Sequence, residues 1–165
     1  MVAEALAPST ITPRRRALSE RNFMELAFAE AEEAAGAGEV PVGCVIVREG
    51  EVIARARNRT IADQDPTAHA EMLALRAAAR AIGAERLAGS DLYVTLEPCA
   101  MCAAAISFTR IRRLYYGAAD DKGGAVQSGV RFFAQPTCHH RPEIYGGIGE
   151  TRASALLKEF FAARR

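Results

Sequence analysis

The sequence predicts a single α/β domain in which helices and strands alternate along the chain. The chain has 165 residues, the size of one domain with a sizeable core, and 50% of them are hydrophobic. Short apolar runs rich in β-branched residues predict strands, and alanine- and leucine-rich segments between them predict helices. Glycine and proline mark the ends of most segments, and we find no internal repeat or second domain.

The first half of the chain predicts a helix, a hairpin and a second helix. Ser19 is the predicted N-cap of a helix over residues 20–35, which Gly36 and Gly38 end. The elements that follow are a strand at 42–47, a turn at 49–50, a strand at 52–57 and a helix over 66–81. Because a short turn joins the two strands, we expect them to pair as a hairpin.

The second half predicts three further strands and two helices. In order, these are a strand at 92–96, a helix from Pro98 to 108, strands at 111–116 and 143–148, and a closing amphipathic helix at 150–164. The stretch 117–141 is glycine-rich and irregular, with one helical turn predicted near 130–133.

Composition narrows the class of protein. The charges nearly cancel to a formal +1, which argues against a strongly basic nucleic-acid coat protein but leaves room for a local basic patch. No apolar run approaches the length of a membrane span, so we expect no membrane partner, and the N-terminus lacks the apolar stretch of a signal peptide. Residues 1–18, which include Arg14, Arg15 and Arg16, are predicted to form a flexible tail before a domain at 19–165. That arginine run is either solvated or in contact with RNA.

Two short motifs carry the chemistry: His69-Ala70-Glu71 and Pro98-Cys99-Ala100-Met101-Cys102. One imidazole and two thiols supply three ligands to a tetrahedral Zn²⁺ and leave a fourth position for water, which distinguishes a catalytic zinc site from a closed structural one. Glu71 is then placed to shuttle protons without binding the metal. This H-x-E…P-C-x-x-C pattern resembles the signature of the zinc-dependent nucleobase deaminases.

The spacing of the two motifs has a geometric reason. Cys99 and Cys102 are three residues apart, so one helix face can present both to one ion. His69 and Glu71 are about 200° apart on an ideal helix, so both border the site only if they lie in a first turn. Helix N-termini also favour thiolate over thiol. Because such thiolates must stay unoxidised, we expect a reducing cytoplasm.

Other interpretations of the cysteines are weaker. A C-x-x-C pair also occurs in structural zinc fingers and in redox sites. No second pair of ligands follows at finger spacing, and a redox pair does not account for His69 and Glu71. Residues 138–140, Cys-His-His, could suggest a second metal site, but we expect a surface loop there.

Asp65 to Glu71 and Leu92 to Cys102 closely resemble the bacterial tRNA-specific adenosine deaminases, members of the cytidine deaminase-like superfamily. Residues 39–43, 58–59 and 117–122 resemble further elements of that family. The resemblance implies a three-layer α/β/α fold, with a mixed five-stranded sheet and helices on both faces. It also implies a homodimer with one Zn²⁺ per protomer, which converts adenosine to inosine at the wobble position in the anticodon stem-loop of tRNA.

The same resemblance assigns roles to individual residues. His69, Cys99 and Cys102 would bind zinc, and Glu71 would shuttle protons. The positions that would contact substrate are Val42, Asn58, Ala70, Leu96, Asp120, Lys122 and Phe161. Among them Asn58 would hydrogen-bond the flipped base. Structural alternatives stay open for several: a turn residue for Asn58, solvated loop charges for Asp120 and Lys122, and packing for Phe161.

The sequence also departs from the family, chiefly in residues 123–142, which puts the substrate more in doubt than the chemistry. Three functions compete: a tRNA adenosine deaminase, a deaminase of free bases or nucleosides such as guanine, and a non-catalytic zinc or RNA-binding module. Free cytidine deaminases usually have cysteine in place of His69, whereas guanine deaminases share the His-x-Glu arrangement. Glu71 argues against the non-catalytic module, because a scaffold has no need of that carboxylate.

Overall fold

The computed structural model describes residues 13–165, with side chains from residue 22 onward. The elements of this part of the chain are, in order, α1 (Pro13–Gly36), β1 (Gly43–Arg48), β2 (Glu51–Arg57), α2 (Ala70–Ile82), β3 (Ser90–Leu96), α3 (Ala100–Phe108), β4 (Arg113–Ala118), the short 3₁₀ helix η1 (Phe132–Ala134), β5 (Glu143–Tyr145) and α4 (Glu150–Ala162). None of the helices in this range has the length and apolar character needed to span a membrane.

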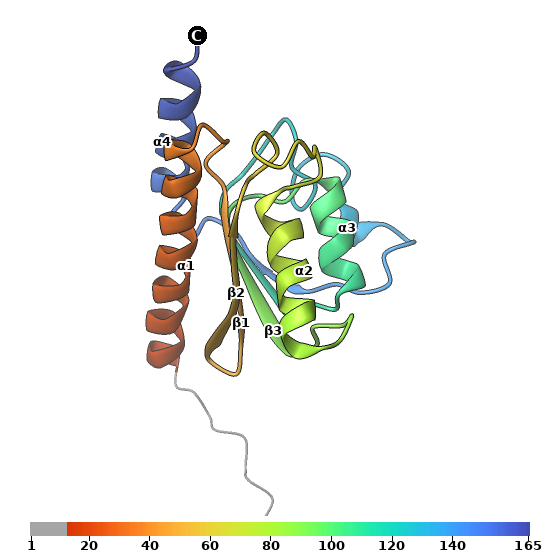
Figure 1. Cartoon of the computed structure of the whole chain (residues 1–165). Coiled ribbons are helices and arrows are strands. Elements are labelled where there is room, and N and C mark those ends of the chain that lie inside the picture. The colour runs from red at the N-terminus through yellow and green to blue at the C-terminus, as the bar shows by residue number, and fades with distance from the viewer. Residues whose placement is uncertain (1–12) are drawn as a thin grey trace, which may run out of the picture.

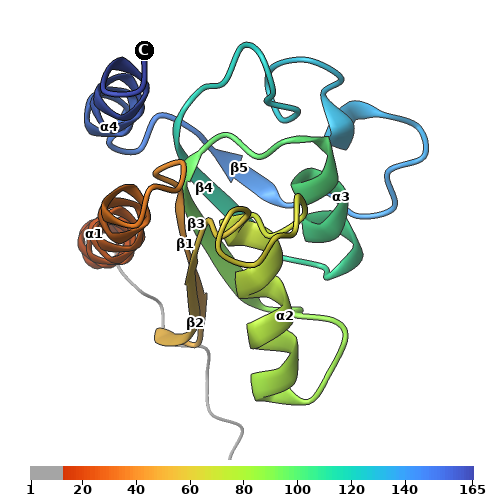
Figure 2. The same ribbon diagram turned by 45° about the horizontal axis from the view of Figure 1, so that its top comes forward.

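The strands form one mixed sheet with the order β2-β1-β3-β4-β5. β1 is antiparallel to both β2 and β3, while β3, β4 and β5 run parallel. Helices α1 and α4 lie on one face of the sheet, and α2 and α3 cover the other (Figures 1 and 2). This arrangement confirms the three-layer α/β/α fold with a five-stranded mixed sheet.

The central strands are largely apolar because both of their faces are covered. Along β1, Val45 joins the cluster under α1, and the neighbouring Cys44 joins the cluster under α2 and α3. Helix α1 packs so closely on β1 that a Cβ atom at Gly43 would lie 1.9 Å from the carbonyl oxygen of Ala27. Glycine at this position therefore sets the distance between α1 and the sheet.

Several predicted boundaries differ from the structure. Helix α1 begins at Pro13, so Ser19 lies inside the helix and is not its N-cap. Proline is favoured as a first helical residue because the N–H at that position makes no hydrogen bond within the helix, so its absence costs nothing. Residues 13–18 of the predicted tail are therefore helical, and residues 1–12 lie outside the described residues. The predicted strand at 143–148 is only Glu143–Tyr145, where it pairs with β4.

Candidate functional site

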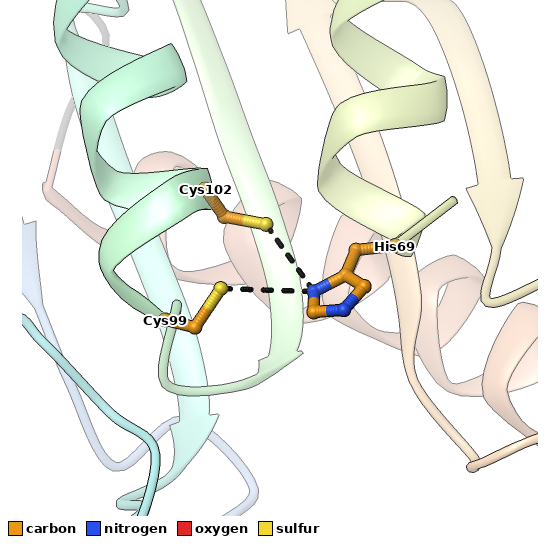
Figure 3. Close-up of side chains that lie close together, drawn as sticks. All are labelled: His69, Cys99 and Cys102. Atoms are coloured by element: carbon orange, nitrogen blue, oxygen red, sulfur yellow. Dashed lines mark hydrogen bonds between the residues drawn. The ribbon is translucent and has the colours of Figure 1, made fainter. Parts of the chain in front are cut away.

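His69 is the N-cap residue of α2 and not, as predicted, part of its first turn. Its backbone is extended, with φ −72° and ψ 150°, and its side chain does not cap the helix. A turn before it fixes this position: the Asp65 carboxylate accepts hydrogen bonds from the backbone N–H of Thr67 at 2.8 Å and from its hydroxyl at 2.7 Å. The imidazole is therefore directed away from its own helix and toward α3 (Figure 3).

Cys99 and Cys102 come from the start of α3. Cys99 is the N-cap residue, with extended backbone, and Cys102 is buried in the first turn. The Sγ atom of each cysteine lies 3.6 Å from Nδ1 of His69, and the dashed lines in Figure 3 mark both contacts. The three ligand atoms all lie within 4.8 Å of one another.

These distances fit a zinc ion. Tetrahedral bonds of about 2.1 Å to nitrogen and 2.3 Å to sulfur place the two ligand atoms about 3.6 Å apart. Within residues 22–165, no other His, Cys, Asp or Glu joins the group. Three soft or borderline ligands and a fourth position without a protein ligand are typical of a catalytic zinc site. His69, Cys99 and Cys102 are thus positioned to bind the metal.

The thiols differ in their acidity. The hydrogen bond from the Cys102 thiol and, to a smaller extent, the neighbouring His69 lower the pKa of Cys99 to about 4, against the opposing effect of burial. The same hydrogen bond, together with burial, raises the pKa of Cys102. Cys99 is therefore a thiolate in the free site, and Cys102 must give up its proton when a metal binds.

Glu71, the second residue of α2, is 4% exposed. Burial raises the pKa of Glu71 to about 7, against the opposing effect of the hydrogen bond from its own backbone N–H. Burial disfavours the charged form of a carboxyl group, so such a group both accepts and releases a proton near neutral pH. The position of His69 one residue before the helix explains how His69 and Glu71 can border one site.

Three of the predicted substrate-binding residues gather beside α2. Val42 and Ala70 are buried in the same hydrophobic cluster. Asn58 is 7% exposed, and its backbone N–H donates to the carbonyl oxygen of Val42 at 3.1 Å. An amide side chain both donates and accepts hydrogen bonds, so Asn58 can serve a polar ligand at this place.

The other four predicted substrate-binding residues line a single pocket, which we call the α4 pocket. It lies between α4 and the segment 119–123 and has a volume of about 1080 Å³. Its lining includes Leu96, Asp120, Lys122 and Phe161, with the basic residues Lys158, Arg164 and Arg165. The residues that could bind the metal do not line the pocket. Leu96 does, and it lies two residues before Pro98 and three before Cys99 in the chain. Its volume is slightly above the ~300–1,000 Å³ of small-ligand pockets, so the pocket has room for more than one base-sized group.

Two buried glutamates beside the site were missed by the sequence reasoning. Glu97 and Glu39 are each 2% exposed. Glu39 accepts hydrogen bonds from the backbone N–H groups of Ile61 and Ala62 at 3.0 and 2.8 Å, and so holds the loop that follows Asn58. Glu97 accepts hydrogen bonds from the segment that follows β4. For Glu97, the available signal was a carboxylate directly after an apolar strand and directly before Pro98.

The segment 138–140 forms a loop, as expected. His140 Nε2 lies 2.7 Å from the carbonyl oxygen of Ile111, and the Cys138 thiol donates to the backbone oxygen of His140. These contacts hold the loop against the end of α3. Among residues 22–165, the segment takes part in no metal-binding group.

Comparisons with known proteins agree on one family. The model of the cytidine and deoxycytidylate deaminase zinc-binding region matches residues 18–118. A tRNA-specific adenosine deaminase of Agrobacterium fabrum is 60% identical over 149 residues, which cover 90% of this chain and 98% of the relative. A solved structure from a study of A-to-I editing by tRNA:A34 deaminases has a TM-score of 0.81 and 62% identity, over 82% of this chain and 99% of that chain. The guanine deaminase of Bacillus subtilis has a TM-score of 0.58 and 40% identity, over 59% of this chain and 63% of that chain.

Proposed function

The chain belongs to the cytidine and deoxycytidylate deaminase zinc-binding family, and we propose that within it the chain hydrolyses adenosine to inosine and ammonia at the wobble position of tRNA. The observation that carries the chemistry is the convergence of His69, Cys99 and Cys102 beside the buried Glu71. Such a site activates water next to a proton carrier, as hydrolytic deamination requires.

The substrate assignment is supported by the relatives. The tRNA-specific adenosine deaminase of Agrobacterium fabrum matches over nearly its whole length at 60% identity. The guanine deaminase of Bacillus subtilis matches at 40% identity over less than two thirds of its chain. The tRNA substrate is therefore favoured over free guanine.

The chemistry divides between the metal and Glu71. When bound by His69, Cys99 and Cys102, zinc would lower the pKa of a water molecule and so supply the nucleophile. The Glu71 carboxylate takes a proton from the attacking water and delivers protons to the ring nitrogen and to the leaving amine. Its pKa of about 7 suits both transfers, and its burial keeps bulk water from competing for them. His69 and the two cysteines hold the metal and take no proton in these steps.

The target base is recognised beside α2. We assign to Asn58 the hydrogen bonds to the base, because the residue is nearly buried beside Val42 and its amide can both donate and accept. Val42 and Ala70 supply apolar contacts on one side, and Leu96 lies where the base site meets the α4 pocket. An adenine extruded from a loop is thereby held by both stacking and hydrogen bonds.

The RNA around the target base lies in the α4 pocket. Lys122, Lys158, Arg164 and Arg165 provide positive charge there, against Asp120 and Asp121. Phe161 is 49% exposed and offers a stacking surface. The Asp120 carboxylate accepts hydrogen bonds from the backbone N–H groups of Lys122 and Gly123, so part of its role is to shape the loop.

The working unit we propose is a cytoplasmic homodimer with one zinc per protomer. The exposed Phe108 at the end of α3 supplies apolar surface for such an interface. The thiolate ligands require a reducing compartment. Light scattering at micromolar concentration tests the dimer, and a monomer would overturn it.

A deamination assay tests the substrate. An anticodon stem-loop with a wobble adenosine is compared with free adenosine, guanine and cytidine, and a stem-loop with guanosine at that position is the matched control. We expect inosine in the first RNA and turnover of free compounds lower by orders of magnitude. Efficient release of ammonia from free guanine would contradict the tRNA substrate and identify the protein as a guanine deaminase instead.

A further inference from the structure

The segment after β4 is held from the inside by one buried carboxylate. Glu97 follows the last residue of β3, and all of the hydrogen bonds of its side chain reach into residues 119–128, which we call the 119–128 loop. The donors to Oε1 are the backbone N–H groups of Val126 (3.1 Å), Gln127 (2.9 Å) and Ser128 (2.8 Å). The donors to Oε2 are the backbone N–H of Asp120 (2.8 Å) and the Ser128 hydroxyl (3.0 Å).

The same loop lies against the turn that carries the metal ligand Cys99. Gly124 forms an isolated antiparallel bridge with Cys99, and the N–H of Ala125 donates to the carbonyl oxygen of Pro98 at 2.8 Å. A Cβ atom at Gly124 would lie 2.5 Å from Cδ of Glu97 and 2.5 Å from the backbone oxygen of Asp120. The loop backbone is therefore in direct contact with the carboxylate, and only glycine fits at this point.

The first half of the loop is also a wall of the α4 pocket. Residues 119–123 line that pocket opposite Phe161. We propose that Glu97 is a positioning residue for the RNA substrate, which fixes the 119–128 loop between the Cys99 turn and the α4 pocket. This inference rests on the proposed function, because it assigns that pocket to RNA.

A direct part in the chemistry does not suit Glu97. Its side chain is 2% exposed, and its two oxygens already accept five hydrogen bonds. The metal-binding group does not include it. A carboxylate with this set of donors is suited to hold a backbone, since charge-assisted hydrogen bonds are about twice as strong as neutral ones.

The test compares Glu97→Gln with Asp91→Asn. The glutamine would point N–H groups at backbone donors and so release part of the loop. Asp91 is a matched control: it is also buried, it lies near the other end of β3, and its carboxylate binds Arg112 at 2.8 and 2.9 Å. Zinc content, kcat and KM for the anticodon stem-loop, and amide hydrogen exchange by NMR are measured for both variants and the unmodified protein.

For Glu97→Gln we expect KM to rise about tenfold or more while kcat changes less than about threefold, the signature of lost substrate binding. Amide exchange should accelerate at residues 120 and 126–128, and zinc content should not change. Asp91→Asn should leave KM and these amides as they are. If Glu97→Gln does not fold, Gly124→Ala carries the test, because it displaces the loop and keeps the carboxylate.

Unchanged KM and amide exchange in a folded variant would overturn the proposal while leaving the proposed function intact. A fall in kcat alone would assign Glu97 to the Cys99 turn and overturn it too, as would an equal rise in KM in Asp91→Asn. An unmodified protein that does not deaminate the stem-loop would instead remove the proposed function. The amide exchange rates would then still show whether Glu97 holds the loop.

Discussion

His69 and Cys99 occupy the same position in two different helices, and their side chains meet at 3.6 Å between Nδ1 and Sγ. Each is an N-cap residue with extended backbone that does not cap its own helix. Two helix N-termini thus face one point, where their positive ends favour thiolate and other anionic ligands. The site depends on how α2 and α3 begin, which is why short motifs at two helix starts identify it.

Cys102→Ala should abolish tight zinc binding, because two ligands do not hold zinc in a catalytic site that normally has three. Metal analysis should give about one zinc per chain for the unmodified protein and far less for the variant. Cys138→Ala, which removes a half-buried cysteine outside the site, is the control and should keep its zinc. A full zinc complement in Cys102→Ala would contradict the assignment.

Glu71→Gln should retain zinc and the fold but lose deamination. General acid–base catalysis contributes about 10²–10⁴-fold for one transfer, and Glu71 serves more than one, so the loss in kcat should be at least that large. Single-turnover assays on the stem-loop measure it. Glu85→Gln is the control, because the side chain of Glu85 is 89% exposed, and this variant should behave as the unmodified protein. Substantial turnover by Glu71→Gln would exclude the proton shuttle.

Phe161→Ala should weaken binding of the stem-loop by about 1–3 kcal/mol, the usual contribution of one base stacked on an aromatic ring. Lys158→Gln should reduce the slope of log K against log salt by about one. Fluorescence anisotropy at several salt concentrations measures both. Val52→Ala, at an exposed apolar residue of β2, is the control. Unchanged affinity in Phe161→Ala would return that residue to a packing role.

Tyr116 should make the stability of the fold sensitive to alkaline pH. Burial raises the pKa of Tyr116 to about 12, and its hydroxyl donates to Oε1 of Gln127. The folded state therefore favours the neutral phenol, so this stabilisation is complete below about pH 10 and is lost as the pH rises toward 12. Urea unfolding at pH 9 and 11.5 should show the difference between unmodified protein and Tyr116→Phe becoming smaller at the higher pH. A constant difference would contradict this prediction.

Gly43→Ala should destabilise the fold, because its Cβ would lie 1.9 Å from the carbonyl oxygen of Ala27 and force α1 away from the sheet. Overpacking of this kind costs about 1–3 kcal/mol or more. Gly36→Ala is the matched control, since its Cβ would meet no atom within 4 Å. Thermal unfolding of both variants measures the difference, and equal midpoints would show that α1 adjusts.

The sequence was most informative where a local pattern determines the outcome. The apolar runs of β1 and β3 predict strands because both faces are covered, and the ligand motifs predict the metal site because their spacing suits helix starts. The predicted start of α1 was wrong, because Ser19 resembles an N-cap residue while the helix extends back to Pro13. Local rules cannot tell which of two possible starts a helix uses.

The Glu97 hydrogen bonds could not be predicted in this way, because they join residues 23 to 31 positions apart. Four of the five partners are backbone groups, which leave no trace in the sequence. The roles of Phe160 and Phe161, which are consecutive residues of α4, could not be predicted from the sequence either. Phe160 is buried beneath Arg164, whereas Phe161 lines the α4 pocket, and only the rotation of α4 decides between them.

The anchoring of the 119–128 loop has a consequence for how this protein can change over generations. Four of the five groups that Glu97 holds are backbone N–H groups, which every residue except proline possesses. The shape of the loop thus depends mainly on the Glu97 carboxylate and on Gly124, with help from Asp120, and exposed side chains such as Lys122 are not needed to maintain it. Mutation can change the side chains that this loop presents to a substrate while the course of its backbone stays the same. The departure from the family that we expect in residues 123–142 is compatible with such a division of labour.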